Sequence, residues 1–274
     1  MKTKKKSTCC LNCGNTFEGN FCPHCGQSAK VKRLQAGEML KNAIGPFVGG
    51  DNRFLRTAWQ LITRPGHLVR DYLLGKRIRY YHPLQMYVFL LTAYAITCYV
   101  LGINISIFDQ SSDISFGDYE RDGLVLASVR KVADYFNFIE NDKLYGTLAA
   151  VIFAVPVFTW IFRKVHLPRP DGTSQPLCAT ENFYAQMYSS CIDLLLSTFL
   201  LPLSLIEGIG DWLLNAFGAV TFAYVIVLYR QMLGLKWPRA ILLCGIGFAL
   251  TLALFVFVLL AIVLIALGLD LLMR

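Results

Sequence analysis

The sequence has few charged side chains and none of the short motifs that mark well-known enzyme classes. Charged residues make up 16% of the 274 positions, whereas 55% are apolar, and the mean hydropathy is +0.48. Such an excess of apolar residues excludes an ordinary soluble domain. The chain has no phosphate-cradling glycine loop, no nucleophile elbow and no paired catalytic carboxylates. The excess of apolar residues favours a membrane protein, and the absence of these motifs argues only against the well-known enzyme classes.

Acidic residues are scarce in the first 82 positions. This region holds 15 of the 26 Lys and Arg but only four acids, namely Glu18, Glu38, Asp51 and Asp71. We expect it to contact the anionic headgroups of a lipid bilayer. Nucleic acid is the competing polyanion, and it is not expected because the basic residues adjoin apolar segments. A signal peptide is also lacking, since the run Lys2–Lys6 leads into cysteines, so the amino terminus is expected to stay cytosolic.

Five segments are candidates for transmembrane helices, because a helix needs about 20 apolar residues to cross the hydrocarbon layer. They are residues 84–108, 146–162, 182–206, 212–229 and 241–269. The second segment contains Pro156, which a neighbouring helix can accommodate. The sequence therefore predicts an all-α polytopic membrane protein of about five transmembrane helices, with the bundle spanning residues 83–274.

Loop charges orient these spans, because Lys and Arg accumulate in cytosolic loops. The connection at 109–145 carries eight acids against four bases and is predicted to lie outside, whereas the basic turns at 163–176 and 230–239 are predicted inside. The amino terminus is then cytosolic and the carboxyl terminus outside. Within the outer connection, apolar residues at helical spacing over 125–136 predict a short amphipathic helix. It could rest on the outer leaflet or cap the bundle.

Two CxxC pairs, each followed by glycine, stand near the amino terminus. Tetrahedral zinc takes four thiolates, and a two-residue gap lets one turn present two sulfurs to the same ion. The predicted ligands are Cys10, Cys13, Cys22 and Cys25. Disulfides are the alternative, but the cytosol keeps thiols reduced. Residues 1–30 are therefore predicted to form a ribbon around one structural Zn²⁺, with Phe17 and Phe21 supplying apolar contacts. Cys9 is a spare thiol that could compete with Cys10.

Residues 31–82 mix apolar positions with Arg and Lys, which predicts two basic amphipathic helices joined at Arg-Pro-Gly and lying in the headgroup plane. The apolar positions of the first helix are Phe54, Leu55, Ala58, Trp59 and Ile62, and those of the second are Leu68, Val69, Tyr72 and Leu73. The basic residues expected to reach lipid phosphates are Arg64, Arg70, Lys76, Arg77 and Arg79. Each such contact contributes about 1 kcal/mol near an anionic leaflet.

The double CxxC ribbon, the Arg-Pro-Gly junction and the segment GKRIRYYHP occur here in one order. In this arrangement the chain resembles a family of bacterial membrane proteins known as a domain of unknown function. The shared positions are Cys10, Cys13, Cys22, Cys25, Arg64, Pro65, Gly66, Tyr72, Gly75, Lys76, Arg77, Tyr80 and Pro83. The resemblance covers roughly residues 9–100. It implies placement in a bacterial cytoplasmic (inner) membrane, and it carries over no catalytic residue.

Asp193 lies near the middle of the third predicted span. A carboxylate there is costly and is expected to face the bundle interior, a partner or a water path. It could relay protons or cations. It could equally be a packing device that is protonated, or hydrogen bonded to Ser189, Ser190 or a neighbouring helix.

These features lead to three functional hypotheses. The leading one is a non-enzymatic scaffold whose ribbon recruits or positions a cytosolic protein partner at the membrane face. The alternative is a small transporter or channel that uses Asp193. The second alternative is a lipid-modifying membrane enzyme that holds phosphate headgroups with its basic segment, although the sequence offers it no nucleophile or base.

Overall fold

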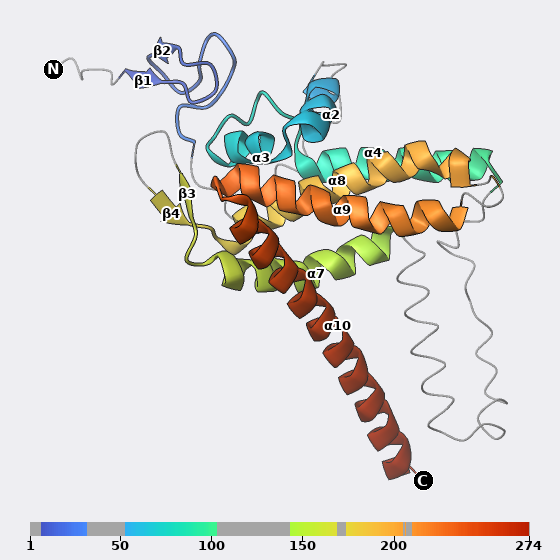
Figure 1. The fold of residues 1–274 in the computed structure, drawn as a ribbon. Coiled ribbons are helices and arrows are strands. Elements are labelled where there is room, and N and C mark those ends of the chain that lie inside the picture. The colour runs from blue at the N-terminus through green and yellow to red at the C-terminus, as the bar shows by residue number, and fades with distance from the viewer. Residues whose placement is uncertain are drawn as a thin grey trace.

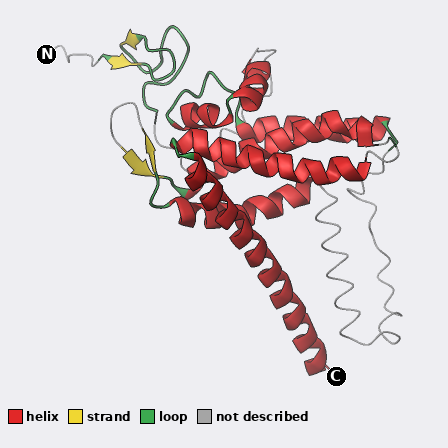
Figure 2. Cartoon of the chain, viewed as in Figure 1, coloured by secondary structure: helices red, strands yellow, loops and turns green. Residues whose placement is uncertain are grey.

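The computed structural model describes residues 7–31, 53–102, 143–168, 174–204, 206 and 210–273. Helix makes up most of this described part, and strands form two short hairpins within it (Figure 2). The elements are β1 (Thr8–Cys9), β2 (Thr16–Phe17), α2 (Arg53–Thr63), α3 (Pro65–Leu73), α4 (Pro83–Val100), α7 (Lys143–Phe162), β3 (His166–Pro168), β4 (Ser174–Pro176), α8 (Ala179–Ser204), α9 (Gly210–Leu233) and α10 (Trp237–Met273). The amphipathic helix predicted at 125–136 lies outside the described residues.

Helices α4, α7, α8 and α9 lie side by side, and α10 leaves this bundle and continues beyond it (Figure 1). Helix α8 is central, because it packs against α4, α7 and α9. The hairpin of β3 and β4 joins the end of α7 to the start of α8, and β3 also contacts α9. The sequence analysis predicted this connection only as a basic turn.

Three helical segments of the described chain are long and apolar enough to cross a membrane: Pro83–Val100, Ala216–Leu233 and Trp237–Val258. The apolar stretch Gly146–Phe162 is shorter. The first helix ends at Val100 and not near 108, whereas α10 has 37 residues and exceeds its predicted span at both ends. At about 1.5 Å per residue, α10 is roughly 55 Å long, which is more than the hydrocarbon layer requires.

A buried polar network connects α7, α8 and α9. The Asn182 amide nitrogen donates to the Val155 carbonyl oxygen at 3.1 Å and to the Thr159 hydroxyl at 3.2 Å. The Tyr229 hydroxyl donates to the Asn182 amide oxygen, and the Gln186 amide donates to the Tyr229 hydroxyl at 3.0 Å. Asn182 is fully buried. Since each of these polar groups has a partner, the network holds three helices together without an unpaired dipole in the core.

The second amphipathic helix does not lie on lipid with its apolar face, contrary to the prediction. Leu68, Val69, Tyr72 and Leu73 are all buried in the protein core, where α3 packs against α8 and α9. The pattern of apolar residues was read correctly, but the surface that covers them is protein. A periodic pattern shows which face is buried and not what buries it.

The predicted apolar face of helix α2 has a buried part and an exposed part. Phe54 and Ala58 pack against the core beside the buried residues Thr57 and Leu61. Leu55, Trp59 and Ile62 are exposed by 69%, 68% and 52%. Because residues advance about 100° around a helix, these three positions are rotated away from the buried side, and they form a separate exposed apolar stripe.

The Arg-Pro-Gly junction between α2 and α3 fits closely against α9. Pro65 has no N–H to donate to the carbonyl of Leu61, and the Tyr224 hydroxyl of α9 donates to that oxygen instead, at 2.8 Å. Gly66 donates its N–H to the side-chain oxygen of Gln231 at 3.1 Å. A β-carbon at Gly66 would lie 2.5 Å from the Met232 nitrogen. Only glycine therefore permits this approach of the two backbones.

We predict that Gly66→Ala destabilises the protein by about 1–3 kcal/mol, because the added methyl group collides with the α9 backbone. The midpoint of thermal unfolding in detergent would fall accordingly. Gly218→Ala is the matched control, since a β-carbon at this position of α9 meets nothing within 4 Å. That variant should be as stable as the parent or slightly more stable. Equal stability of Gly66→Ala and the parent would contradict the proposed close approach.

Candidate metal centre and the turn that carries it

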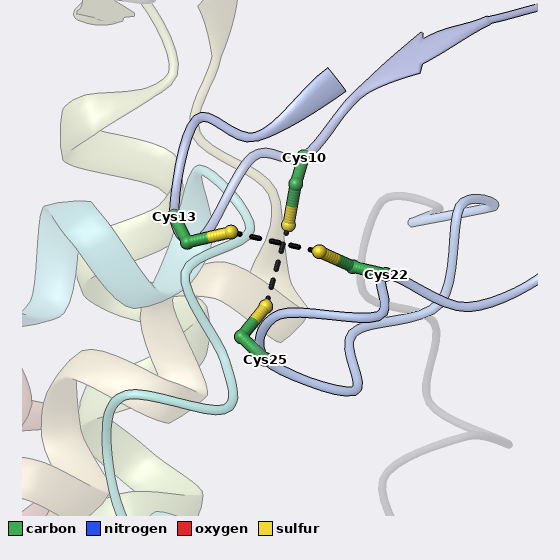
Figure 3. A group of neighbouring side chains, drawn as sticks. All are labelled: Cys10, Cys13, Cys22 and Cys25. Carbon is green, nitrogen blue, oxygen red and sulfur yellow. Dashed lines mark hydrogen bonds between the residues drawn. The ribbon is translucent and has the colours of Figure 1, made fainter. Parts of the chain in front are cut away.

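The four cysteines of the two CxxC pairs come together in the ribbon, which is defined here as residues 7–31. Their sulfur atoms all lie within 4.8 Å of one another. Two distances between the pairs are 3.5 Å, from Cys10 to Cys25, and 3.6 Å, from Cys13 to Cys22 (Figure 3). Four sulfurs at 2.3 Å from a tetrahedral ion would be about 3.8 Å apart. The cluster therefore fits one metal ion with a closed ligand set.

The same turn occurs twice in the ribbon. The backbone carbonyl oxygen of Cys10 accepts a hydrogen bond from the Gly14 N–H at 2.9 Å. The carbonyl oxygen of Cys22 accepts one from the Gly26 N–H at 2.8 Å. In both turns the glycine has a positive φ, 77° at Gly14 and 75° at Gly26, a conformation that side chains other than glycine rarely adopt. Each turn presents two sulfurs, and the β1–β2 hairpin carries the first of them.

The environment of Cys25 favours the thiolate, which is the form that binds metals. Desolvation raises the pKa of Cys25, but hydrogen bonds with the Asn12 side chain and the Gln27 backbone outweigh it and lower the pKa to about 6. The pKa of Cys13 rises despite a hydrogen bond with the Asn15 backbone, because desolvation and the neighbouring sulfurs favour its protonated form. The pKa values of Cys25 and Cys13 are thus shifted in opposite directions.

Phe17 and Phe21 differ in their surroundings. Phe17 is buried against Cys10 and Cys22, as predicted, whereas Phe21 is 66% exposed and does not contribute to the core of the ribbon. Cys9 is exposed, and its sulfur lies 3.5 Å from the Gly14 carbonyl oxygen, outside the four-sulfur group. With so little apolar core, the ribbon would gain much of its stability from a bound metal ion.

The ribbon packs against the turn between α3 and α4, residues 74–82, which is called the Gly75 turn below. Gln27 is only 3% exposed, and its amide nitrogen donates to the Gly75 carbonyl oxygen at 2.6 Å. The side chains of Leu11 and Val31 lie against Gly75, within 3.0 and 3.2 Å of where a β-carbon would stand. The ribbon is therefore attached to the segment that leads directly into α4. The sequence analysis treated the two as separate regions.

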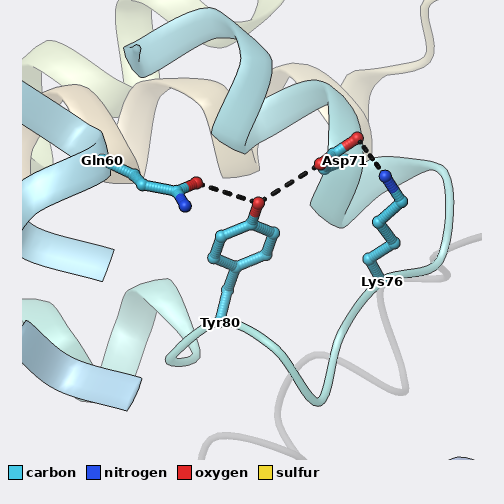
Figure 4. A network of polar contacts seen from close by, with 4 residues as sticks. All are labelled: Gln60, Asp71, Lys76 and Tyr80. Carbon is cyan, nitrogen blue, oxygen red and sulfur yellow. Dashed lines mark hydrogen bonds and ion pairs between the residues drawn. The ribbon is translucent and has the colours of Figure 1, made fainter. Parts of the chain in front are cut away.

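A polar network holds the Gly75 turn to α2 and α3 (Figure 4). The Tyr80 hydroxyl lies 3.0 Å from the Gln60 amide oxygen and 3.2 Å from the Asp71 carboxylate, so its proton can be donated to either. Asp71 also forms an ion pair with Lys76 at 2.9 Å. Burial, followed by the charge of Asp71, raises the pKa of Tyr80 to about 12. The hydroxyl therefore stays protonated and continues to donate.

The five basic residues predicted to contact headgroups have different surroundings. The Lys76 ammonium forms an ion pair with Asp71 at 2.9 Å. Arg70 and Arg77 are partly buried, and Arg77 has an interaction partner within the protein. Arg64 and Arg79 are exposed. These two arginines are therefore accessible at the surface of the protein.

His82 ends the Gly75 turn next to a cluster of tyrosines. One of its ring nitrogens, Nε2, lies 3.3 Å from the Tyr184 hydroxyl, and its ring centre is 6.3 Å from that of Tyr72. Desolvation and the positive charge of Arg77 lower the pKa of His82 to about 4. The ring is neutral at pH 7 and belongs to the packing between the turn and α8.

Asp193 lies in α8 and is partly buried. It has an interaction partner within the protein, so it is not an unpaired carboxylate in the bundle. Sequence reasoning singled it out for its charge and missed Asn182, Tyr224 and Tyr229. These neutral residues make the hydrogen bonds between helices, and no rule based on charge or apolar runs identifies them.

The fold and the cysteine cluster define a mostly helical protein with membrane-length apolar helices and an amino-terminal group of four cysteines that could bind one metal ion. Within it, residues 51–95 match the family described as protein of unknown function (DUF3667). This confirms the resemblance to a family of unknown function over α2, α3, the Gly75 turn and most of α4. No curated protein and no solved structure gives a significant match to the chain.

We predict that the purified protein holds one divalent metal ion per chain. Replacing Cys10 and Cys22 by serine would remove one ligand from each turn and abolish binding, because the remaining two sulfurs cannot enclose the ion. Elemental analysis of the purified protein measures the number of metal ions per chain. Cys9→Ser is the matched control and should retain the ion, since its sulfur lies outside the cluster. Loss of the ion in Cys9→Ser alone would overturn the ligand assignment.

We also predict that His82 makes the protein less stable in acid. The unfolded chain takes up a proton near pH 6.5, whereas folded His82 does so only near pH 4. Stability from the neutral ring is therefore complete above pH 6.5 and is lost as the pH falls from 6.5 towards 4. Thermal unfolding at pH 7 and pH 5 measures the difference. His82→Gln should show a smaller decrease than the parent, and an equal decrease would argue against this role.

Proposed function

We propose that this chain is a membrane-integrated scaffold that uses a zinc-loaded ribbon to recruit a cytosolic protein to the membrane face. The observation that carries this proposal is the attachment of the ribbon to the Gly75 turn through Gln27, Leu11 and Val31. A ribbon on a flexible tether would adopt many positions relative to the membrane. A ribbon held against the start of a membrane-length helix presents one face at one height above the bilayer.

Zinc is the ion proposed for the cluster. Four thiolates suit a tetrahedral ion of borderline softness, and Zn²⁺ forms such sites without redox chemistry. A site with four protein ligands leaves no position for a reactive water, so its role would be structural.

Five membrane-spanning helices are part of this proposal. Helices α7 and α8 would join the three membrane-length segments, because both pack within the same bundle. Helix α8 can cross despite its polar residues, since Asn182 and Gln186 have partners on neighbouring helices. The basic connections at 163–176 and 230–239 support a cytosolic position for the ribbon end, with the carboxyl terminus outside.

The exposed ring of Phe21 is the proposed contact for the partner. This large aromatic side chain has 66% of its surface exposed and is therefore available for contact. Aromatic residues dominate the binding energy of many protein interfaces, because they fill a pocket on the partner at low entropic cost. The partner would therefore offer a small apolar pocket.

The test is in-cell crosslinking followed by pull-down of the intact protein and its variants. We expect the parent and Cys9→Ser to capture the same partner, and the variant with all four cluster cysteines replaced by serine to lose it. Phe21→Ser should lose the partner while keeping its metal ion, which separates recognition from folding of the ribbon. The proposal would be falsified if the four-serine variant captured every partner of the parent.

Transport through the bundle has weaker support, because Asp193 already has an interaction partner. Ion flux in proteoliposomes compares the parent with Asp193→Asn. Flux in the parent that disappears in this variant would favour transport over recruitment.

A further inference from the structure

A cleft opens where α2, α3 and the Gly75 turn meet, on the side of the network shown in Figure 4. Its volume is about 480 Å³, within the range of ligand sites in proteins. The side chains that define its chemistry are Trp59, Gln60, Arg64, His67, Arg79 and Tyr80. The cleft is separate from the cysteine cluster, and the function proposed above does not use it.

The lining of the cleft is positively charged. The guanidinium groups of Arg64 and Arg79 form no ion pair with any residue in the described part of the chain. Asp71 is the acid in the lining, and its charge is compensated by Lys76. Two guanidinium groups are therefore left facing the cleft without a counter-charge from it. Such groups bind phosphate oxygens through paired N–H donors.

Neutral donors complete the lining. The Gln60 amide oxygen accepts from Tyr80, which fixes the side chain and leaves its NH₂ group for a ligand. The same hydrogen bond and the Asp71–Lys76 ion pair hold the floor of the cleft in place. A rigid floor lowers the entropic cost of binding, because fewer side chains must be ordered when a ligand enters.

An apolar surface lies next to the positively charged lining of the cleft. The exposed stripe of Leu55, Trp59 and Ile62 runs along α2 towards the cleft, and Trp59 belongs to both. A ligand that satisfies both surfaces carries a phosphate group and a hydrocarbon chain. Tryptophan commonly lies at the level where headgroups meet acyl chains.

We propose that this cleft binds the phosphate group of an anionic phospholipid, with Arg64 and Arg79 on the phosphate oxygens and the α2 stripe against the acyl chains. The inference goes beyond the proposed function, since it requires neither the metal ion nor a protein partner. It also assigns different roles to three of the five basic residues of this region. Arg64 and Arg79 hold the ligand, whereas Lys76 positions Asp71 and the floor.

The test is native mass spectrometry of the full-length protein released from nanodiscs that contain equal amounts of phosphatidylglycerol and phosphatidylcholine. We expect the parent to retain phosphatidylglycerol in preference. Replacing Arg64 and Arg79 by glutamine should reduce this retention by roughly tenfold for each guanidinium lost. Arg56→Gln is the matched control, because Arg56 is exposed on α2 outside the cleft lining, and it should retain lipid like the parent.

Two further arms keep the result decisive. Should the glutamine variant fail to fold, lysine at both positions preserves the charge but removes the paired donors, and we expect it to retain less phosphatidylglycerol than the parent. Inorganic phosphate and glycerol 3-phosphate are added as soluble competitors. Phosphatidylglycerol retention that is equal in the parent and in the arginine variants would overturn the site. Binding of the soluble phosphates that exceeds binding of the lipid would overturn the lipid as its ligand.

Discussion

At Gly66 the backbones of α3 and α9 come closer than any side chain would allow. The positions of α3, the Gly75 turn and the ribbon depend on that contact. The Gly66 N–H and the Leu61 carbonyl are both bonded by side chains of α9. This contact fixes the start of α3 and therefore the position of Asp71 in the same helix. Asp71 forms the ion pair with Lys76, and its carboxylate lies 3.2 Å from the Tyr80 hydroxyl. The Gly75 turn is thereby held in place, and so is the ribbon that packs on it.

This order of dependence joins two regions that look unrelated in the sequence. Residues 51–95, which match a family of unknown function, contain the junction, the network and the turn. The cysteine cluster lies outside that match, yet Gln27 connects it to Gly75 through a buried hydrogen bond. The matched segment thus acts as a connector. It bonds to the bundle through Gly66 of α3 and to the ribbon through Gly75, and its exposed Arg64 and Arg79 line the cleft.

Much of this arrangement could be predicted from the sequence, but only where the signal is local. Cysteine spacing predicts the convergence of four sulfurs, because each pair is set by a single turn. Apolar runs predict α4, α9 and α10 within several residues. The burial of α3 against protein could not be predicted, since an apolar face looks the same whether lipid or a helix covers it. The exposure of Phe21 and the role of Tyr224 depend on residues far away in the chain, and neither has a pattern of its own.

The two matching turns of the ribbon have a consequence for how it would respond to the supply of metal. Each turn offers two sulfurs, and two sulfurs alone bind an ion too weakly to offset the entropy of ordering the loop. Neither half can therefore be occupied while the other stays empty. The ribbon would gain or lose its structure in a single step, and through Gln27 the start of α4 would gain or lose a neighbour at the same threshold.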